Sequence, residues 1–195
     1  YVANGPTSGT QRFGDQFVSS VNLADGTVKS RLDVAGTGQG GQVVGTFGDQ
    51  VAFAGYDVGD QVNVGFAYDG TIFSAAPAGA ERNAGYGYYA TLYVYRAGSG
   101  VSYADYGDAR YDAYKVVGES RFIYFDGDNV ARNQRVDEAL AGSFQLDRLG
   151  TYDVFSGLSI FASTNGNPAR ITLDFSHTAT LSIDPPAGVT YTSDS

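Results

Sequence analysis

Tyrosine is the residue type that offers the most chemistry in this chain, which has 195 residues and fifteen tyrosines. Many of them crowd into residues 86–114. A tyrosine ring brings a large contact area at a low cost in side-chain entropy, and its hydroxyl can stay hydrated. Such a strip suits a protein interface or stacking on sugar rings, and the candidate contact residues are Tyr89, Tyr93, Tyr95, Tyr103 and Tyr106. The alternative is that tyrosine only serves as a strand-forming aromatic residue.

Oxygen ligands gather in one short loop that contains Asp126, Asp128 and Asn129. Hard cations such as Ca²⁺ prefer oxygen ligands of this kind. The loop lacks the remaining ligands of an EF-hand, and an ordinary hairpin turn explains the same residues. These three residues are therefore candidate calcium ligands, with the turn as the alternative interpretation.

Catalytic constellations are not evident in the sequence. His177 is the only histidine, there is no cysteine, and no Gly-x-Ser-x-Gly motif supplies a nucleophile. The three glutamates, Glu81, Glu119 and Glu138, fall in different segments, whereas a glycoside hydrolase needs two carboxylates that converge on one bond. We therefore expect no enzymatic activity.

Composition excludes further classes. The formal net charge is −9, and the twelve basic residues are scattered, which disfavours nucleic acid because binding a polyphosphate requires clustered Lys and Arg. No apolar run approaches the roughly 20 residues of a membrane helix, so the chain as given is not expected to insert into a membrane. A hydrophobic content of 43% is enough for the core of a single domain.

The elements that must position these residues are strands, because apolar and polar residues alternate with a period of two over several stretches. Residues 88–95 divide into two sides of a strand. Tyr88, Ala90, Leu92 and Val94 lie on one side, and Tyr89, Thr91, Tyr93 and Tyr95 make the other side rich in tyrosine. Turn pairs such as Asp25-Gly26, Asp69-Gly70 and Asp126-Gly127 favour tight reversals between strands. We predict about ten strands in an all-β, single-domain antiparallel β-sandwich, jelly-roll-like in form.

Some segments are expected to depart from this pattern. Residues 1–17 are predicted to form an extended N-terminal segment, a docking or donor strand, ahead of a sandwich domain over residues 18–195. The glycine-rich residues 36–41 are predicted to be a loop. The polar stretch from Val130 to Ala141 is expected to be a loop that leads into a strand over 139–146, and a break is expected near His177 within the strand 171–183.

The carboxyl-terminal third resembles a known family. Asp174-Phe175-Ser176-His177-Thr178-Ala179-Thr180-Leu181-Ser182, followed by Pro186-Ala187-Gly188-Val189-Thr190-Tyr191-Thr192-Ser193, is similar to the terminal strand region of bacterial PEP-CTERM surface proteins, which often read DFSNTATLS and then PxGVTxTS. In this chain His177 replaces the usual asparagine. The resemblance implies export and exosortase-dependent sorting, with a link to exopolysaccharide and biofilm, and it carries over no catalytic residues.

These expectations combine into two functional hypotheses. The sequence contains no methionine, and its start is expected to be that of a mature, secreted protein from which a signal peptide has been removed. The first hypothesis is a non-enzymatic structural protein of the cell surface or biofilm matrix, a homo-oligomer or filament assembled through strand contacts with Tyr1 to Phe17 as the donor segment. The alternative is an extracellular carbohydrate-binding module whose exposed tyrosines stack on exopolysaccharide.

Overall fold

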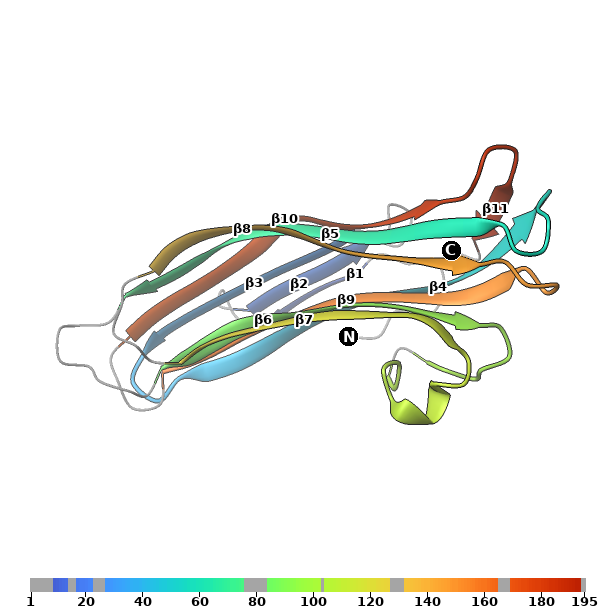
Figure 1. Cartoon of the computed structure of the whole chain (residues 1–195). Helices are drawn as coiled ribbons and strands as arrows, with labels where there is room; N and C mark the ends of the chain where they lie inside the picture. Colours follow the sequence, from blue (N-terminus) through green and yellow to red (C-terminus); the bar gives the residue numbers. More distant parts are fainter. Residues whose placement is uncertain are drawn as a thin grey trace.

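The structure, a computed structural model, describes residues 9–13, 17–22, 27–75, 84–102, 104–126, 132–164 and 169–193. Two layers of β-sheet lie face to face along the length of the molecule (Figure 1). One excursion, which carries the short 3-10 helix η1 (Ala109–Tyr111), projects from the lower layer. The prediction of an all-β sandwich is confirmed.

Sheet A has six strands in the spatial order β1-β2-β3-β10-β5-β8. Their bounds are β1 (Gly9–Phe13), β2 (Phe17–Asn22), β3 (Thr27–Gly36), β5 (Gln61–Ala75), β8 (Arg132–Gln145) and β10 (Ala169–Asp184). Sheet B has five strands in the order β11-β4-β9-β6-β7. Their bounds are β4 (Gly40–Ala54), β6 (Gly85–Arg96), β7 (Lys115–Asp126), β9 (Thr151–Ser163) and β11 (Thr190–Ser193). Neighbouring strands in both sheets run antiparallel.

The eight strands from β3 to β10 follow the jelly-roll order, which confirms the predicted fold class. β3 to β6 alternate between the sheets, β7 stays beside β6, and β8 to β10 alternate again on the return. The return places β10 between β3 and β5, and β9 between β4 and β6, as in a pair of Greek keys. β1 and β2 extend sheet A beyond β3, and β11 extends sheet B beyond β4.

The core lies between the sheets because successive side chains of a strand point to opposite faces. Along β5 every second residue from Val62 to Ser74 is buried. Sheet B contributes fully buried residues such as Leu92 and Leu158 from its inner face, each expected to stabilise the fold by about 1.5–3 kcal/mol through removal from water. Many outward-facing residues of β6 and β9 are also buried, so other side chains must cover part of the outer face of sheet B.

Several predicted boundaries were wrong. The loop predicted over the glycine-rich residues 36–41 is shorter than expected: only residues 37–39 form a tight turn, and residues 36, 40 and 41 belong to β3 and β4. Residues 132–138 belong to β8 rather than to a loop, because cross-strand pairing with β5 overrides their polar composition. The break expected near His177 is present only as an irregularity: β10 is a continuous strand, but its register against both neighbours shifts there, and His177 is exposed.

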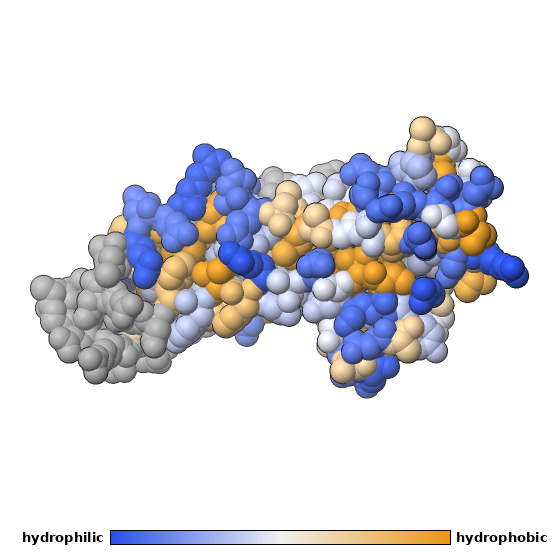
Figure 2. Space-filling model, in the orientation of Figure 1, coloured by the Kyte–Doolittle hydropathy of each residue, from blue (hydrophilic) through white to orange (hydrophobic). Residues whose placement is uncertain are grey.

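The outer face of sheet A is polar. The Arg31 guanidinium donates to Asp33 at 2.9 Å and to Asp174 at 3.2 Å, and the Thr172 hydroxyl donates to Asp33 at 2.6 Å. Hydrophilic residues cover much of this upper layer on the side that Figure 2 shows. The two outer faces of the sandwich therefore differ in kind, since sheet B carries aromatic residues where sheet A carries charges.

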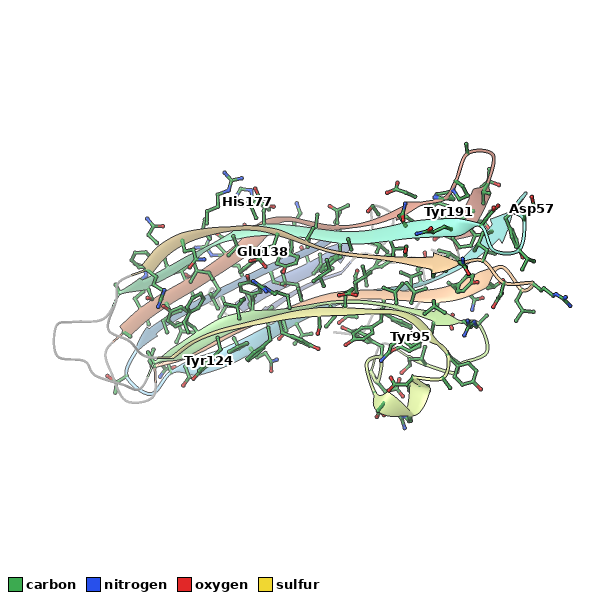
Figure 3. The ribbon with its side chains drawn as sticks, viewed as in Figure 1. Asp57, Tyr95, Tyr124, Glu138, His177 and Tyr191 are labelled. Carbon is green, nitrogen blue, oxygen red and sulfur yellow. The ribbon has the colours of Figure 1, made fainter. Side chains whose placement is uncertain are left out.

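β7 and β8, which lie at the same edge of the sandwich, meet through their side chains. Arg121 of β7 forms an ion pair with Glu138 of β8 at 3.6 Å. Glu138 lies between the layers in Figure 3, and it accepts a hydrogen bond of 2.9 Å from the Tyr68 hydroxyl. Burial first, and then the nearby Glu138 carboxylate, raise the pKa of both Tyr68 and Tyr88 above the ordinary value of 10.

We therefore expect the protein to lose stability at alkaline pH. A tyrosine whose pKa is raised by folding stabilises the native state fully below pH of about 10, and this contribution is lost as the pH rises above that value. Titration of phenolate absorbance, with circular dichroism recorded in parallel, should show that Tyr68 and Tyr88 ionise only as the strands unfold. If all tyrosines ionised in one step near their ordinary pKa with the fold intact, the raised pKa of Tyr68 and Tyr88 would be contradicted.

Candidate functional site

The outer face of sheet B contains a region without any charge. It consists of three outward positions on each of four neighbouring strands, which the register aligns in rows. We call these twelve positions the aromatic face: Gln42, Val44 and Thr46 of β4; Gly157, Ser159 and Phe161 of β9; Gly87, Tyr89 and Thr91 of β6; Ser120, Phe122 and Tyr124 of β7. On a chain with a net charge of −9, such a neutral region is a distinct chemical environment.

Three rings form the centre of the aromatic face. The ring planes of Phe122, Tyr124 and Phe161 lie within 17° of one another, and their centroids are 5.9–6.4 Å apart in every pairing. Three equal separations exclude a column, in which the outer two rings would lie twice as far apart. The three rings therefore form a compact cluster of parallel, offset rings, and Phe122 is 61% and Tyr124 51% exposed.

Glycines beneath the rings allow this arrangement. A side chain at Gly85 would overlap the Tyr124 hydroxyl, and one at Gly87 would first overlap the Ile123 backbone carbonyl and would also come within 2.9 Å of the tip of the Phe161 ring. The outer ends of both side chains thus reach over β6. Covering a strand glycine with a neighbouring aromatic ring also compensates for the missing side chain.

Uncharged hydrogen-bonding groups and one further aromatic residue surround the three rings. The Gln42 amide nitrogen donates to the Ser159 hydroxyl at 2.8 Å, which holds an exposed amide beside Phe161. Tyr89 is 37% exposed and meets Phe122 edge to face at 6.2 Å. Ser120 of β7 is also exposed. The face can therefore offer flat apolar contact together with neutral donors and acceptors.

The 97–114 loop, which joins β6 to β7, covers the neighbouring end of the same outer surface. Tyr106 from this loop stacks on Phe155 at 5.3 Å with an interplanar angle of 9°, and it meets Tyr93 edge to face at 5.7 Å. The Gly107 amide donates to the Tyr95 hydroxyl at 2.8 Å. Tyr124 and Tyr95 lie toward opposite ends of the lower layer in Figure 3, so the loop covers one end of sheet B. The Tyr106 hydroxyl also covers Thr91 and Gly157 at the border of the aromatic face, and the positions nearer Tyr124 and Phe161 are not covered by it.

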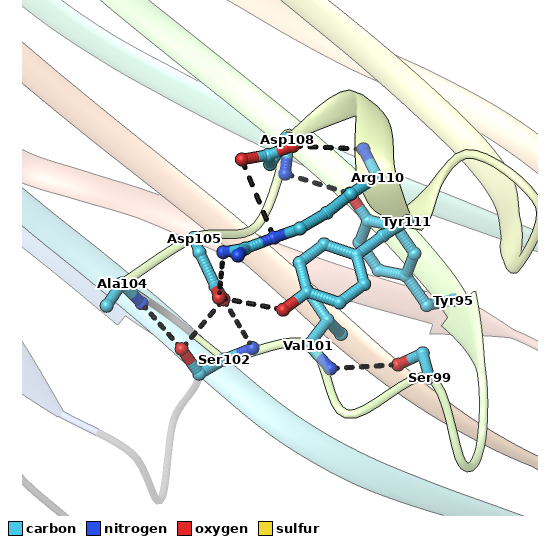
Figure 4. Close-up of polar contacts among 10 residues, drawn as sticks. Tyr95, Ser99, Val101, Ser102, Ala104, Asp105, Asp108, Arg110 and Tyr111 are labelled. Atoms are coloured by element: carbon cyan, nitrogen blue, oxygen red, sulfur yellow. Dashed lines mark hydrogen bonds and ion pairs between the residues drawn. The ribbon is translucent and has the colours of Figure 1, made fainter.

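Asp105 fixes the shape of this loop (Figure 4). Its carboxylate accepts hydrogen bonds from the Ser102 amide and hydroxyl, both at 2.8 Å, and from the Tyr111 hydroxyl at 2.8 Å. Arg110 forms an ion pair with it at 2.6 Å. The Ser102 backbone amide is the main cause that lowers the pKa of Asp105 from 3.8 to about 2, followed by the two hydroxyls.

The predicted contact tyrosines fall into separate environments. Tyr89 belongs to the aromatic face. Tyr93 and Tyr106 are half-buried at the base of the loop, and Tyr103 lies outside the described residues. Tyr95 is fully buried, so its assignment to an exposed strip was wrong: the loop that follows β6 folds back over it, and burial raises the pKa of its hydroxyl.

The predicted calcium ligands stay a prediction. Asp126 ends β7, and its side chain, together with Asp128 and Asn129, lies outside the described residues. Within the described part of the chain, no three His, Cys, Asp or Glu side chains gather as a metal site would require. The same part contains no helix long and apolar enough to cross a membrane.

Sequence reasoning missed the central residues of the face. The density of tyrosines predicts contact residues within 86–114, whereas Phe122, Tyr124 and Phe161 come from β7 and β9. A usable signal was present: Phe122 and Tyr124 alternate with Arg121 and Ile123, which places two aromatic residues on one side of a strand. Which strands lie beside β7 could be read only from the sheet order.

Comparison with known proteins adds no relative. No protein-family model matches the chain, and neither curated proteins nor solved structures give a match. The resemblance to PEP-CTERM proteins therefore stays a prediction, and functional argument rests on the aromatic face itself.

Asp105 provides a pH test of the loop. A carboxylate whose pKa is lowered by folding stabilises the native state above its ordinary pKa, and this contribution is lost as the pH falls from about 4 to about 2. We expect Asp105→Asn to lower the melting temperature near pH 5 and the difference from the parent protein to shrink toward pH 2. Asp184→Asn, at an exposed position on sheet A, is the control; a deficit for Asp105→Asn that did not change with pH would contradict the assignment.

Proposed function

We propose that this chain is a non-catalytic extracellular binding module that holds an uncharged polysaccharide against its aromatic face. The observation that carries the proposal is the partly exposed cluster of parallel rings formed by Phe122, Tyr124 and Phe161. A sugar ring presents an apolar face of C–H bonds and a rim of hydroxyls. The π faces of exposed rings attract such C–H groups, and the neighbouring amide and hydroxyl groups of Gln42 and Ser120 suit the rim.

Charge favours a neutral polymer over an acidic one. The twelve positions contain no Lys or Arg with which to pair carboxylate or sulfate groups, and the chain as a whole carries a formal charge of −9. An anionic polysaccharide would therefore meet repulsion without a compensating contact. Binding to a neutral polymer through stacking and neutral hydrogen bonds should in turn depend little on salt.

The size of the face favours a polysaccharide over a protein partner. Four strands about 4.8 Å apart and three outward positions per strand about 6.8 Å apart give a patch of roughly 300–400 Å². A stable protein interface buries about 800 Å² on each partner and is enriched in Arg, Met and aromatic residues. The aromatic face supplies the aromatic residues alone and about half the area, which suits a short stretch of sugar polymer.

Substitution of Phe122 tests the proposal. We expect Phe122→Ala to weaken retention on soluble neutral polysaccharides (hydroxyethylcellulose, mannan, xylan, dextran) by about tenfold, because stacking contacts and buried area are lost together. Affinity electrophoresis measures this, with alginate as the anionic polymer. Phe73→Ala is the matched control, since Phe73 is 39% exposed on β5 of the other sheet.

The contrary results are specific. No retention of the parent protein by any neutral polymer, or equal losses for Phe122→Ala and Phe73→Ala, would overturn the proposal. If Phe122→Ala instead abolished a dimer seen by analytical ultracentrifugation, the occupant of the face would be a second copy of the chain.

Strand-mediated assembly is the second candidate function, and the position of β1 favours it. The described part of the N-terminal segment, Gly9–Phe13, is the outermost strand of sheet A and pairs with β2 alone. An edge strand of this kind exposes unpaired backbone groups, which can exchange between subunits or accept another strand.

Electron microscopy tests this second candidate. We expect the full chain to form ordered fibres and a variant without Tyr1 to Phe17 to remain as single particles, because the exchangeable edge is then missing. Single particles from both proteins would rule out strand donation and leave polysaccharide binding as the sole proposal.

A further inference from the structure

The aromatic face ends at a step where the 97–114 loop begins. Phe155 lies over Gly48, where an added side chain would come within 2.8 Å of the ring, and Tyr106 stacks on top of Phe155. The stacked pair of Phe155 and Tyr106 therefore stands beside the cluster of Phe161, Tyr124 and Phe122. The Tyr106 hydroxyl reaches down to the Thr91 hydroxyl at 3.2 Å, so Tyr106 forms the base of a wall along one side of the face.

One row of outward-facing residues crosses the four strands through Phe122, and the residues at both of its ends are exposed. It runs from Phe122 on β7 through Tyr89 and Ser159 to Val44 on β4. Phe122 and Val44, its two end residues, are 61% and 56% exposed. The distance between the β7 and β4 axes is about 14 Å, so an extended chain lying along this row can enter over one edge residue and leave over the other.

We infer that the face takes an internal stretch of a linear, uncharged polysaccharide, which crosses sheet B from β7 to β4 alongside the wall that Tyr106 begins. This inference rests on the proposed function and adds the direction and the branching of the ligand. A sugar branch on the side of the wall would meet the stacked Tyr106 and Phe155 rings. The loop is therefore the element that selects unbranched chains.

Pairs of polymers with the same backbone test this selection: linear mannan with galactomannan, unsubstituted xylan with arabinoxylan, and hydroxyethylcellulose with xyloglucan. We expect the parent protein to bind the linear member of the pair that it recognises at least about tenfold more tightly, by isothermal titration calorimetry. Tyr106→Phe keeps the ring on Phe155 and should keep this preference. Tyr106→Ala removes the base of the wall and should reduce the preference to less than about threefold.

The outcomes separate this inference from the proposed function. Equal affinity of the parent protein for linear and branched members, with both lost in Phe122→Ala, would overturn the inference and leave the binding function standing. A preference that persists in Tyr106→Ala would show that Tyr106 is not the selecting residue. Absence of binding to every polymer would overturn both. Melting temperature and circular dichroism of each variant show whether the fold is intact, and a merely structural role of Tyr106 would lower affinity for both polymers in the same proportion.

Discussion

The register of β6 against β7 and β9 is the constraint on which the rest of the outer surface depends. Inner residues such as Leu92 and Leu158 are buried against sheet A, and a slip of one residue would turn every inner side chain outward. The same register fixes what faces solvent: it places Gly87 between Tyr124 and Phe161. The core and the aromatic face are thus two consequences of one alignment, because side chains alternate along each strand.

Glycine within a strand is unfavourable by about 0.5–1 kcal/mol relative to alanine because of lost backbone entropy. Gly85 and Gly87 of β6 and Gly48 of β4 nevertheless lie beneath Tyr124, Phe161 and Phe155 respectively. Contact with the covering rings restores part of the buried apolar area that glycine, without a side chain, cannot provide. Two of these rings then meet solvent, and the third supports Tyr106 of the 97–114 loop. The packing of aromatic rings over strand glycines therefore forms both the aromatic face and the base of the wall beside it.

Much of the fold could be predicted from the sequence, and the candidate site could be predicted only in kind. Period-two alternation identified β3, the first half of β5 and β6, and it separated the two faces of β6 correctly, since that pattern is local. The turn expected at Asp69-Gly70 was wrong, because these residues lie within β5. The extent of β4 and β8 was missed because pairing with β9 and β5, rather than their own composition, makes those residues strand. An aromatic contact surface was expected, but not all of the predicted residues belong to it. Tyr95 is buried by a loop that folds back, and Phe161, which was not predicted, lies on a strand distant in sequence.

The central claim is that the ring cluster of Phe122, Tyr124 and Phe161 is the ligand-contacting surface. The most direct measurement is an NMR titration of protein labelled on its phenylalanine and tyrosine rings with an oligosaccharide of the neutral polymer that it retains. The account predicts that ring signals of Phe122, Tyr124, Phe161 and Tyr89 shift together, whereas those of Phe73 and Tyr191 do not. Shifts that gather on sheet A, or on β11, with the four face residues unchanged, would contradict it.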